Sequence, residues 1–401
     1  MEFPSVAKCL ATEEKISCGL PDKFEGDGDI AGPGVYFAFV VASGLAVGMG
    51  LLGLGHDRYE HKHGPAHKHV QRTRDLIDAL LISLGDTQFI TSIALLITVF
   101  FFKGCTISAY HYDLVCKLVL ISSASHIGSM AFVRGYFNRD WLLALFRAGL
   151  MIASLALGWA LFVRRQLYSP IFPSAPPVID MENSTSKVNT GLVLPAACFI
   201  DHPGANATTS YSNFTASRYW TRNMTTVVAS NSSTGFTNLN SSGISTNGTT
   251  IPSFSRFSTN DVLSNGDVIA YSFVSVALGF TLLASLVLWR IKDPEKSKQS
   301  LICHLVAHGL RFLSFLIVLG VWIYGLLTFT DLWQWMKKSK WFGEDDAEKS
   351  FSSFGQVMPV VMLLLTLFAM REEHARTLKE KNAKHKRNNS NDSGVPLTDN
   401  K

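Results

Sequence analysis

Residues 183–249 read NSTSKVNTGLVLPAACFIDHPGANATTSYSNFTASRYWTRNMTTVVASNSSTGFTNLNSSGISTNGT and determine how the rest of the chain is interpreted. Sequons of the form N-x-S/T are glycosylated only on the lumenal or extracellular side of a membrane. Helix-length apolar segments lie on both sides of this stretch. We therefore predict that this stretch lies on the lumenal or extracellular side, and the sides of the other loops follow by counting the spans outward from it. Its N-glycosylation candidates are Asn183, Asn206, Asn213, Asn223, Asn231, Asn240 and Asn247.

The composition favours a membrane protein, because 47% of the residues are hydrophobic and 17% are charged, against about 25% charged in soluble domains. A helix needs about 20 apolar residues to cross a bilayer. The segment 75–102 is interrupted by Gly85-Asp86-Thr87-Gln88 but is expected to form one long helix. We therefore predict an all-α, polytopic membrane protein with seven transmembrane helices, at 35–54, 75–102, 114–133, 141–163, 268–289, 301–328 and 351–370.

The count places the N-terminus outside and the C-terminus inside. Basic residues after the first, third and fifth spans and in the tail agree with the positive-inside rule, whereas Arg164 and Arg165 at the outer end of the fourth span do not. A six-span alternative divides 75–102 differently. Residues 1–30 have no apolar core and are not expected to be a cleaved signal peptide. The predicted parts are an outer N-terminal segment (1–34), helices 1–4 (35–165), a glycosylated flexible outer loop (166–266), helices 5–7 (267–370) and a basic cytosolic tail (371–401).

The outer loop is rich in Ser, Thr, Asn and Gly, so it buries too little apolar surface to order itself. The tail is either in contact with anionic lipid headgroups or simply a topology signal. The sequons at Asn388 and Asn391 should then stay unglycosylated. In this topology four cysteines lie outside, where disulfides persist, with free thiols as the alternative. These disulfide candidates allow three pairings: Cys9, Cys18, Cys105 and Cys198.

Histidines crowd the first inner loop. Two H-x-H pairs could hold zinc or copper through ring nitrogens, but the intervening Lys and Arg oppose a dication. An interfacial linker is the default interpretation, and no metal or cofactor is expected. The weak metal candidates are His61, His63, His67 and His69. In the first span, Gly44 and Gly48 form a G-x-x-x-G pair, which predicts close helix packing.

Several polar side chains fall in the cytosolic half of the predicted bundle. An ionisable group inside a span costs a few kcal/mol unless it is paired or hydrated, so these groups should meet one another. We predict one polar cluster, either a site for an ion, proton or anion or a structural network with arginines reaching the headgroups. Its members are Asp86, Gln88, His126, Arg147, His304, His308 and Arg311.

The block from Asp86 to Tyr136 carries a pattern. It reads D-x-Q-x-x-T from Asp86, S-x-Y-H from Ser108, S-S-x-S-H from Ser122 and R-x-Y from Arg134. This block resembles a group of uncharacterised multi-span membrane proteins of filamentous ascomycete fungi, although Gly85 and Tyr112 depart from that pattern. The resemblance covers about fifty residues. It implies a fold and a fungal source and lends no activity.

Function is less constrained than topology. The sequence has no P-loop, no G-x-S-x-G and no H-E-x-x-H, so no enzyme is expected, and membrane spans argue against a nucleic-acid partner. Topology alone favours a receptor or sensor, although the D-R-Y and N-P-x-x-Y motifs of G-protein-coupled receptors are absent. The alternatives are a carrier for a small solute, ion or proton, and a structural or partner-binding protein. The expected location is the plasma membrane or another membrane of the secretory pathway, with the lipid bilayer as the one predicted partner.

Overall fold

The computed structural model describes residues 21–63, 68–133, 141–167, 172–173, 191–200, 266–290 and 298–342. Within these ranges no strand forms, and β pairing is limited to isolated bridges between Phe24 and Phe342 and between Ser108 and Pro195. The elements are helices α2 (Gly28–Ala31), α3 (Pro33–His63), α4 (Lys68–Ile97), the π-helical turn η1 (Thr98–Phe102), α5 (Ala109–Phe132), α7 (Trp141–Leu167), the 3-10 turn η3 (Gly191–Val193), α8 (Ala197–Ile200), α11 (Gly266–Arg290) and α12 (Lys298–Lys338).

Six helices in this described part are long and apolar enough to cross a membrane: α3, α4 continued by η1, α5, α7, α11 and α12. This confirms the prediction of a helical, multi-pass chain. The predicted long helix over 75–102 is also confirmed, because α4 and η1 run through Gly85 without a break. The predicted seventh span, 351–370, lies outside the described residues.

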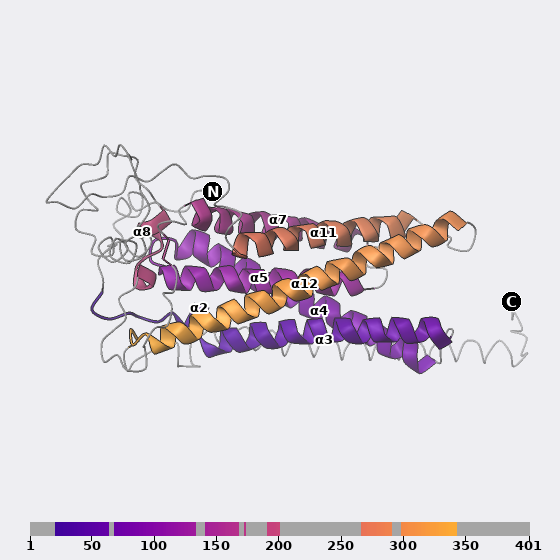
Figure 1. Ribbon diagram of the computed structural model, residues 1–401, viewed down its shortest axis with the longest axis horizontal. Coiled ribbons are helices and arrows are strands. Elements are labelled where there is room, and N and C mark those ends of the chain that lie inside the picture. Colours follow the sequence, from indigo (N-terminus) through magenta and orange to yellow (C-terminus); the bar gives the residue numbers. More distant parts are fainter. Residues whose placement is uncertain are drawn as a thin grey trace, which may run out of the picture.

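The long helices lie along one axis, and successive helices run in opposite directions (Figure 1). We call one end of the bundle the loop end: α7 ends there and α11 begins there, so the segment 168–265 leaves and rejoins the bundle at this end. The starts of α3 and α5 lie there too. The opposite end holds the connections α3–α4, α5–α7 and α11–α12.

Helix α5 is the centre of the bundle, and α3, α4, α7, α11 and α12 all pack against it. Every residue of α5 except Ser123 is buried. Its first turn is capped by Ser108, whose Oγ accepts the His111 backbone N–H at 3.1 Å, as expected of a serine at a helix N-terminus. Large apolar side chains of the surrounding helices point outward, where lipid would cover them, as at Phe37, Phe102, Phe146, Leu305 and Leu327.

Glycines allow close packing, but not at the predicted positions. Among the described residues, the predicted close packing is not seen at Gly44 and Gly48: a Cβ on Gly44 would lie 3.9 Å from Trp322, and one on Gly48 would meet no described atom within 4 Å. Close approach occurs instead where α12 crosses α5, since a Cβ on Gly325 would lie 2.9 Å from Ile121 Cγ1. These crossings hold the central helix tightly among its neighbours.

Candidate functional site

The imidazole of His126 lies in the interior of the bundle, between α4 and α5. It is 5% exposed, and its ring stacks on Phe89 of α4 with 5.2 Å between ring centroids. The ring also lies against the backbone of Gly85, where a Cβ would fall 3.0 Å from Nδ1. Neither ring nitrogen makes a hydrogen bond of ordinary geometry within the described residues, although the Gly85 backbone lies close enough to interact with the ring. Gly85 therefore makes the space that lets the imidazole enter this interface.

Three more buried polar atoms near this interface have no hydrogen-bond partner in the described part of the chain: Gln88 Oε1, Ser92 Oγ and Ser125 Oγ. By contrast, the hydroxyl of Ser122 donates to the backbone carbonyl of Gln88 at 2.8 Å. Buried polar side chains in proteins are normally paired. Five unpaired atoms on two facing helices, including both nitrogens of His126, therefore indicate a place for water or another small polar species.

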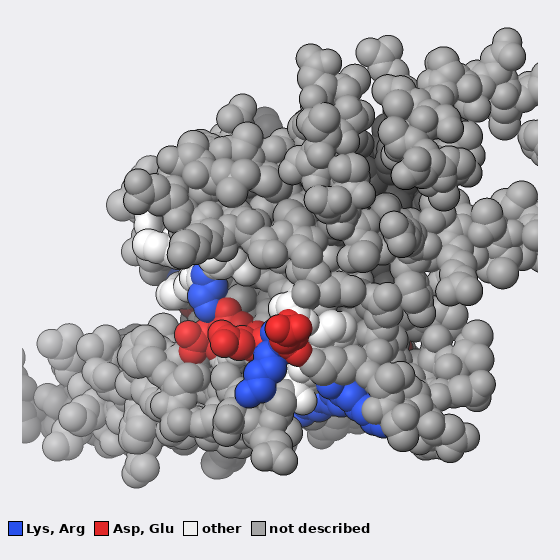
Figure 2. All heavy atoms as spheres, turned by 90° about the vertical axis from the view of Figure 1, so that its left-hand side faces the viewer, with Lys and Arg blue, Asp and Glu red and all other residues white. Residues whose placement is uncertain are grey.

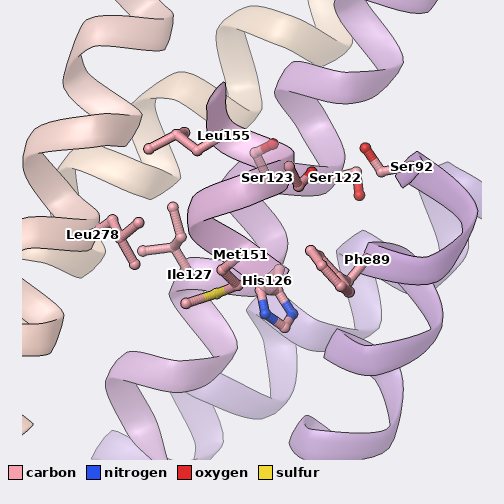
Figure 3. Close-up of a pocket in the computed structure, with 10 residues that line it drawn as sticks. Phe89, Ser92, Ser122, Ser123, His126, Ile127, Met151, Leu155 and Leu278 are labelled. Carbon is pink, nitrogen blue, oxygen red and sulfur yellow. The ribbon is translucent and has the colours of Figure 1, made fainter. Parts of the chain in front are cut away.

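A cavity lies beside these groups (Figure 3). Its volume of about 20 Å³ suits about one water molecule. Four serine side chains and one imidazole supply its polar lining, and the remainder is aromatic, aliphatic or thioether. The lining residues are Phe89 and Ser92 of α4, Ser122, Ser123, His126 and Ile127 of α5, Met151, Ser154 and Leu155 of α7, and Leu278 of α11.

An ion pair lies next to the cavity, toward the opposite end. Arg147 of α7 donates from its terminal guanidinium nitrogen to Asp86 Oδ2 of α4 at 2.5 Å. The side chains are 25% and 31% exposed, respectively, so the pair remains partly open to its surroundings. Asp86 follows Gly85, which faces His126, and Arg147 precedes cavity-lining Met151 by about one helical turn. The pair therefore borders the cavity from two helices.

The structure brings together four of the seven predicted cluster residues: Asp86, Gln88, His126 and Arg147 lie around the α4–α5–α7 junction. Arg311 lies on another seam, where its guanidinium donates to Ser285 Oγ of α11 at 3.4 Å. His308 of α12 is exposed. The side chain of His304 lies outside the described residues.

A second charged group, near the loop end, was not predicted as a site. The carboxylate of Asp267 in α11 binds Lys117 of α5 and also accepts from Arg165 of α7 at 2.5 Å. Arg165 lies 3.0 Å from Asp113 of α5 as well. The hydroxyl of Tyr324 in α12 donates to Asp267 at 2.9 Å. We call these five residues the loop-end ion network; it joins four helices.

The network is buried and electrically balanced. The exposed fractions of the charged side chains are 3% for Asp267, 7% for Lys117, 8% for Asp113 and 13% for Arg165. Two carboxylates face two cations, so the burial of each charge is compensated. Lys117, which is not among the predicted site residues, is a central member.

The network also explains the exception to the positive-inside pattern. Arg165 turns into the bundle and pairs with carboxylates instead of marking the side of the membrane. The sequence held a signal for this: Asp113 and Lys117 are four residues apart and share a helix face. The carboxylate of Asp267, near the start of α11, completes the group, because it pairs with both Lys117 and Arg165.

The loop end is closed by segments from several parts of the chain. The backbone N–H of Asp27 donates to His111 Nε2 at 3.0 Å, and the Asp27 carboxylate pairs with Lys103. Backbone bonds tie Ala109 to Leu194 at 2.7 Å. Acidic and basic side chains lie side by side on this end (Figure 2).

Two of the four cysteine candidates, Cys105 and Cys198, are each disulfide-bonded; Cys9 and Cys18 lie outside the described residues. Cys116 is buried and free. Cys105 lies three residues before Ser108, and Cys198 lies three residues after Pro195; Ser108 and Pro195 are joined by an isolated β-bridge. Covalent bonds therefore reinforce the same end that the charged network holds.

Other predicted sites fall partly or wholly outside the described part of the chain. All seven sequons do, as do His67 and the tail. His61 and His63 end α3 and His69 lies in the first turn of α4, but their side chains are not described. Among the residues that were described, no group of three or more His, Cys, Asp or Glu side chains is arranged to hold a metal ion.

Comparisons of this chain with protein families, with curated proteins and with solved structures find no match.

Proposed function

We propose that this multi-pass membrane protein carries protons through the cavity at His126. The observation that supports this most strongly is the set of five buried polar atoms, on α4 and α5, that have no hydrogen-bond partner within the described residues. A structural network would satisfy such atoms internally. Three of the five atoms, Ser92 Oγ and the two ring nitrogens of His126, belong to residues that line the cavity, where they are available to a transported species.

The chemistry of the lining fits a proton better than a larger solute. An imidazole can accept a proton at one ring nitrogen and release it from the other, and serine hydroxyls both donate and accept. The cavity holds about one water molecule, which could connect His126 with Ser92 or Ser154. No carboxylate lines the cavity, so a metal cation would find no charged ligand there.

Orientation completes the proposal. The loop end is extracellular or lumenal because the sequon-rich segment joins the bundle there. Asp86 and Arg147 then lie between the cavity and the cytosol, on the path that protons would take to and from His126 once this ion pair separates. Ionisable groups inside spans commonly mark such pathways.

Proton flux into proteoliposomes tests this proposal. The purified protein is reconstituted with a trapped pH-sensitive dye, and a potassium gradient with valinomycin drives proton entry. We expect protein-dependent acidification that His126→Gln reduces to the rate of protein-free vesicles. His56→Gln is the matched control, because His56 lies near the end of α3, away from the cavity lining. Equal flux with and without protein, or equal flux in wild type and His126→Gln, would reject the proposal.

The receptor hypothesis from the sequence remains the second candidate and depends on topology. It predicts that the wild-type protein moves no protons and recruits a cytosolic partner, and that removing residues 371–401 abolishes this recruitment. A partner-binding protein would show neither property.

A further inference from the structure

We infer that two layers of ion pairs, which lie on either side of the His126 cavity along the bundle, act as its gates, an inference that rests on the proposed carrier function. One layer is the loop-end ion network. The other is the pair of Asp86 and Arg147, which we call the opposite layer.

The order of residues along four helices places the cavity between the layers. Going from the loop end along α5, Asp113 and Lys117 come before the cavity residues Ser122 to Ile127. Along α11, Asp267 comes before Leu278.

The two remaining helices agree. Going from the loop end along α7, Arg165 comes first, then Leu155 to Met151 at the cavity, then Arg147. Along α4, Ser92 and Phe89 of the cavity come before Asp86. The orders in the four helices are consistent: α5 and α11 carry the network and then cavity residues, α4 carries cavity residues and then Asp86, and α7 carries all three groups in turn.

Helix α7 links the two layers. It supplies an arginine to each, Arg147 and Arg165, about 27 Å apart along the helix at 1.5 Å per residue. Its contacts with α4, α5 and α11 are much sparser than those between α11 and α12 or between α4 and α5. Two hydrogen bonds, from Tyr112 to the Leu161 carbonyl and from Trp159 to Ser275, also join α7 to its neighbours between the cavity and the loop-end network. A tilt of α7 that breaks these bonds together with one layer, while keeping the other layer, would meet the requirement for alternating access to a central site.

The charge balance makes this motion reversible. Each layer is neutral when closed, with two acids and two bases in the loop-end network and one of each in the opposite layer. When a layer opens, water enters with the solute and solvates the separated charges, so the cost is far below that of parting them in a dry interior. A closed layer of paired charges also bars a free proton from crossing.

Thiol accessibility tests the gates directly. Ser154 lines the cavity on α7 and is 4% exposed, so Ser154→Cys places a reporter there with little change in size. The background carries Cys116→Ser and Cys303→Ser, and the same background without the reporter gives the blank. A charged, impermeant thiol reagent is added to right-side-out and to inside-out vesicles.

Removing one arginine should open one side. We expect Arg165→Gln to speed labelling from the loop-end side at least about tenfold, the effect of roughly 1.4 kcal/mol on an equilibrium. Arg147→Gln should do the same from the opposite side only. Lys338→Gln is the control, because it removes the same charge from an exposed residue at the end of α12, which is not a member of either layer, and it should leave both rates unchanged.

Two further measurements guard against misfolding. Size-exclusion profiles identify variants that fail to fold, and Asp113→Asn/Arg165→Gln, which removes one charge of each sign, repeats the loop-end test without a net charge change. Acceleration from one side by Arg165→Gln or by this double variant supports the gate. Equal acceleration from both sides, or equal effects of Lys338→Gln and Arg165→Gln, would overturn it.

Labelling does not depend on proton flux, so the two proposals fail separately. Side-specific labelling in a protein that moves no protons would reject the carrier and keep the gates. Proton flux without side-specific labelling would keep the carrier and reject the gates.

Discussion

Asp267→Asn is the most informative perturbation of the fold, because one buried carboxylate holds partners from three other helices. The substitution keeps the shape and one acceptor oxygen for Tyr324 but removes the negative charge. Arg165 still has Asp113 at 3.0 Å. Lys117, which is 7% exposed, loses its carboxylate. The variant therefore leaves one uncompensated cation in the interior.

Breaking a buried ion pair from one side costs about 3–5 kcal/mol. At roughly 1–2 °C per kcal/mol for a chain of 401 residues, the midpoint of thermal unfolding should fall by roughly 3–10 °C. Fluorescence-detected size exclusion after heating measures this in detergent. Asp331→Asn is the matched control on exposed α12 surface and should change stability by less than about 0.5 kcal/mol.

The double variant Asp267→Asn/Lys117→Met separates charge from packing. It removes the orphaned cation as well and leaves the neutral pair of Arg165 and Asp113. We expect stability within about 1–2 kcal/mol of wild type, because replacing both members of a buried pair is often nearly neutral. A double variant as unstable as Asp267→Asn, or a single variant as stable as Asp331→Asn, would refute the reasoning.

Three other predictions follow from the same structure. Gly85→Ala should destabilise the protein by about 1–3 kcal/mol through overpacking, because the new Cβ would lie 3.0 Å from His126 Nδ1. Gly149→Ala in α7 is the control, because its Cβ would meet no described atom within 4 Å. Thermal unfolding compares the two variants, and equal effects would contradict the cavity geometry. Cys105→Ser or Cys198→Ser should cost about 2–5 kcal/mol, seen as a lower unfolding midpoint; a midpoint equal to that of wild type would show that these disulfides do not hold the loop end. Mass-spectrometric glycosite mapping should find sugar within residues 183–247 and none at Asn388 or Asn391; the reverse would invert the orientation.

Much of the fold could be predicted because the length of an apolar segment can be counted directly along the sequence. The continuity of α4 through Gly85-Asp86-Thr87-Gln88 followed from its length, although a polar interruption could have been a loop. The pairing of Asp86 with Arg147 could be predicted because an unpaired charge inside a span is costly in free energy. Such a charge needs a partner at a similar depth in the membrane, and depth can be counted along the sequence.

What could not be read is the direction in which a side chain points around its helix axis. Lys117, Arg165 and Asp267 all lie near span ends, where reaching the headgroups is the ordinary outcome. The segments that carry them are apolar on all sides, so periodicity marks no inner face. Arg311 failed for the same reason: its depth was suitable, but it faces α11 and not α4.

The central claim is that the interface beside His126 holds a small polar species, and electron cryomicroscopy of the protein in nanodiscs, at a resolution that shows ordered water, tests it most directly. The account predicts density in the cavity of about 20 Å³, within hydrogen-bond distance of a His126 ring nitrogen and of a serine hydroxyl. An empty cavity in which His126, Gln88 and the serines hydrogen-bond to one another would contradict it.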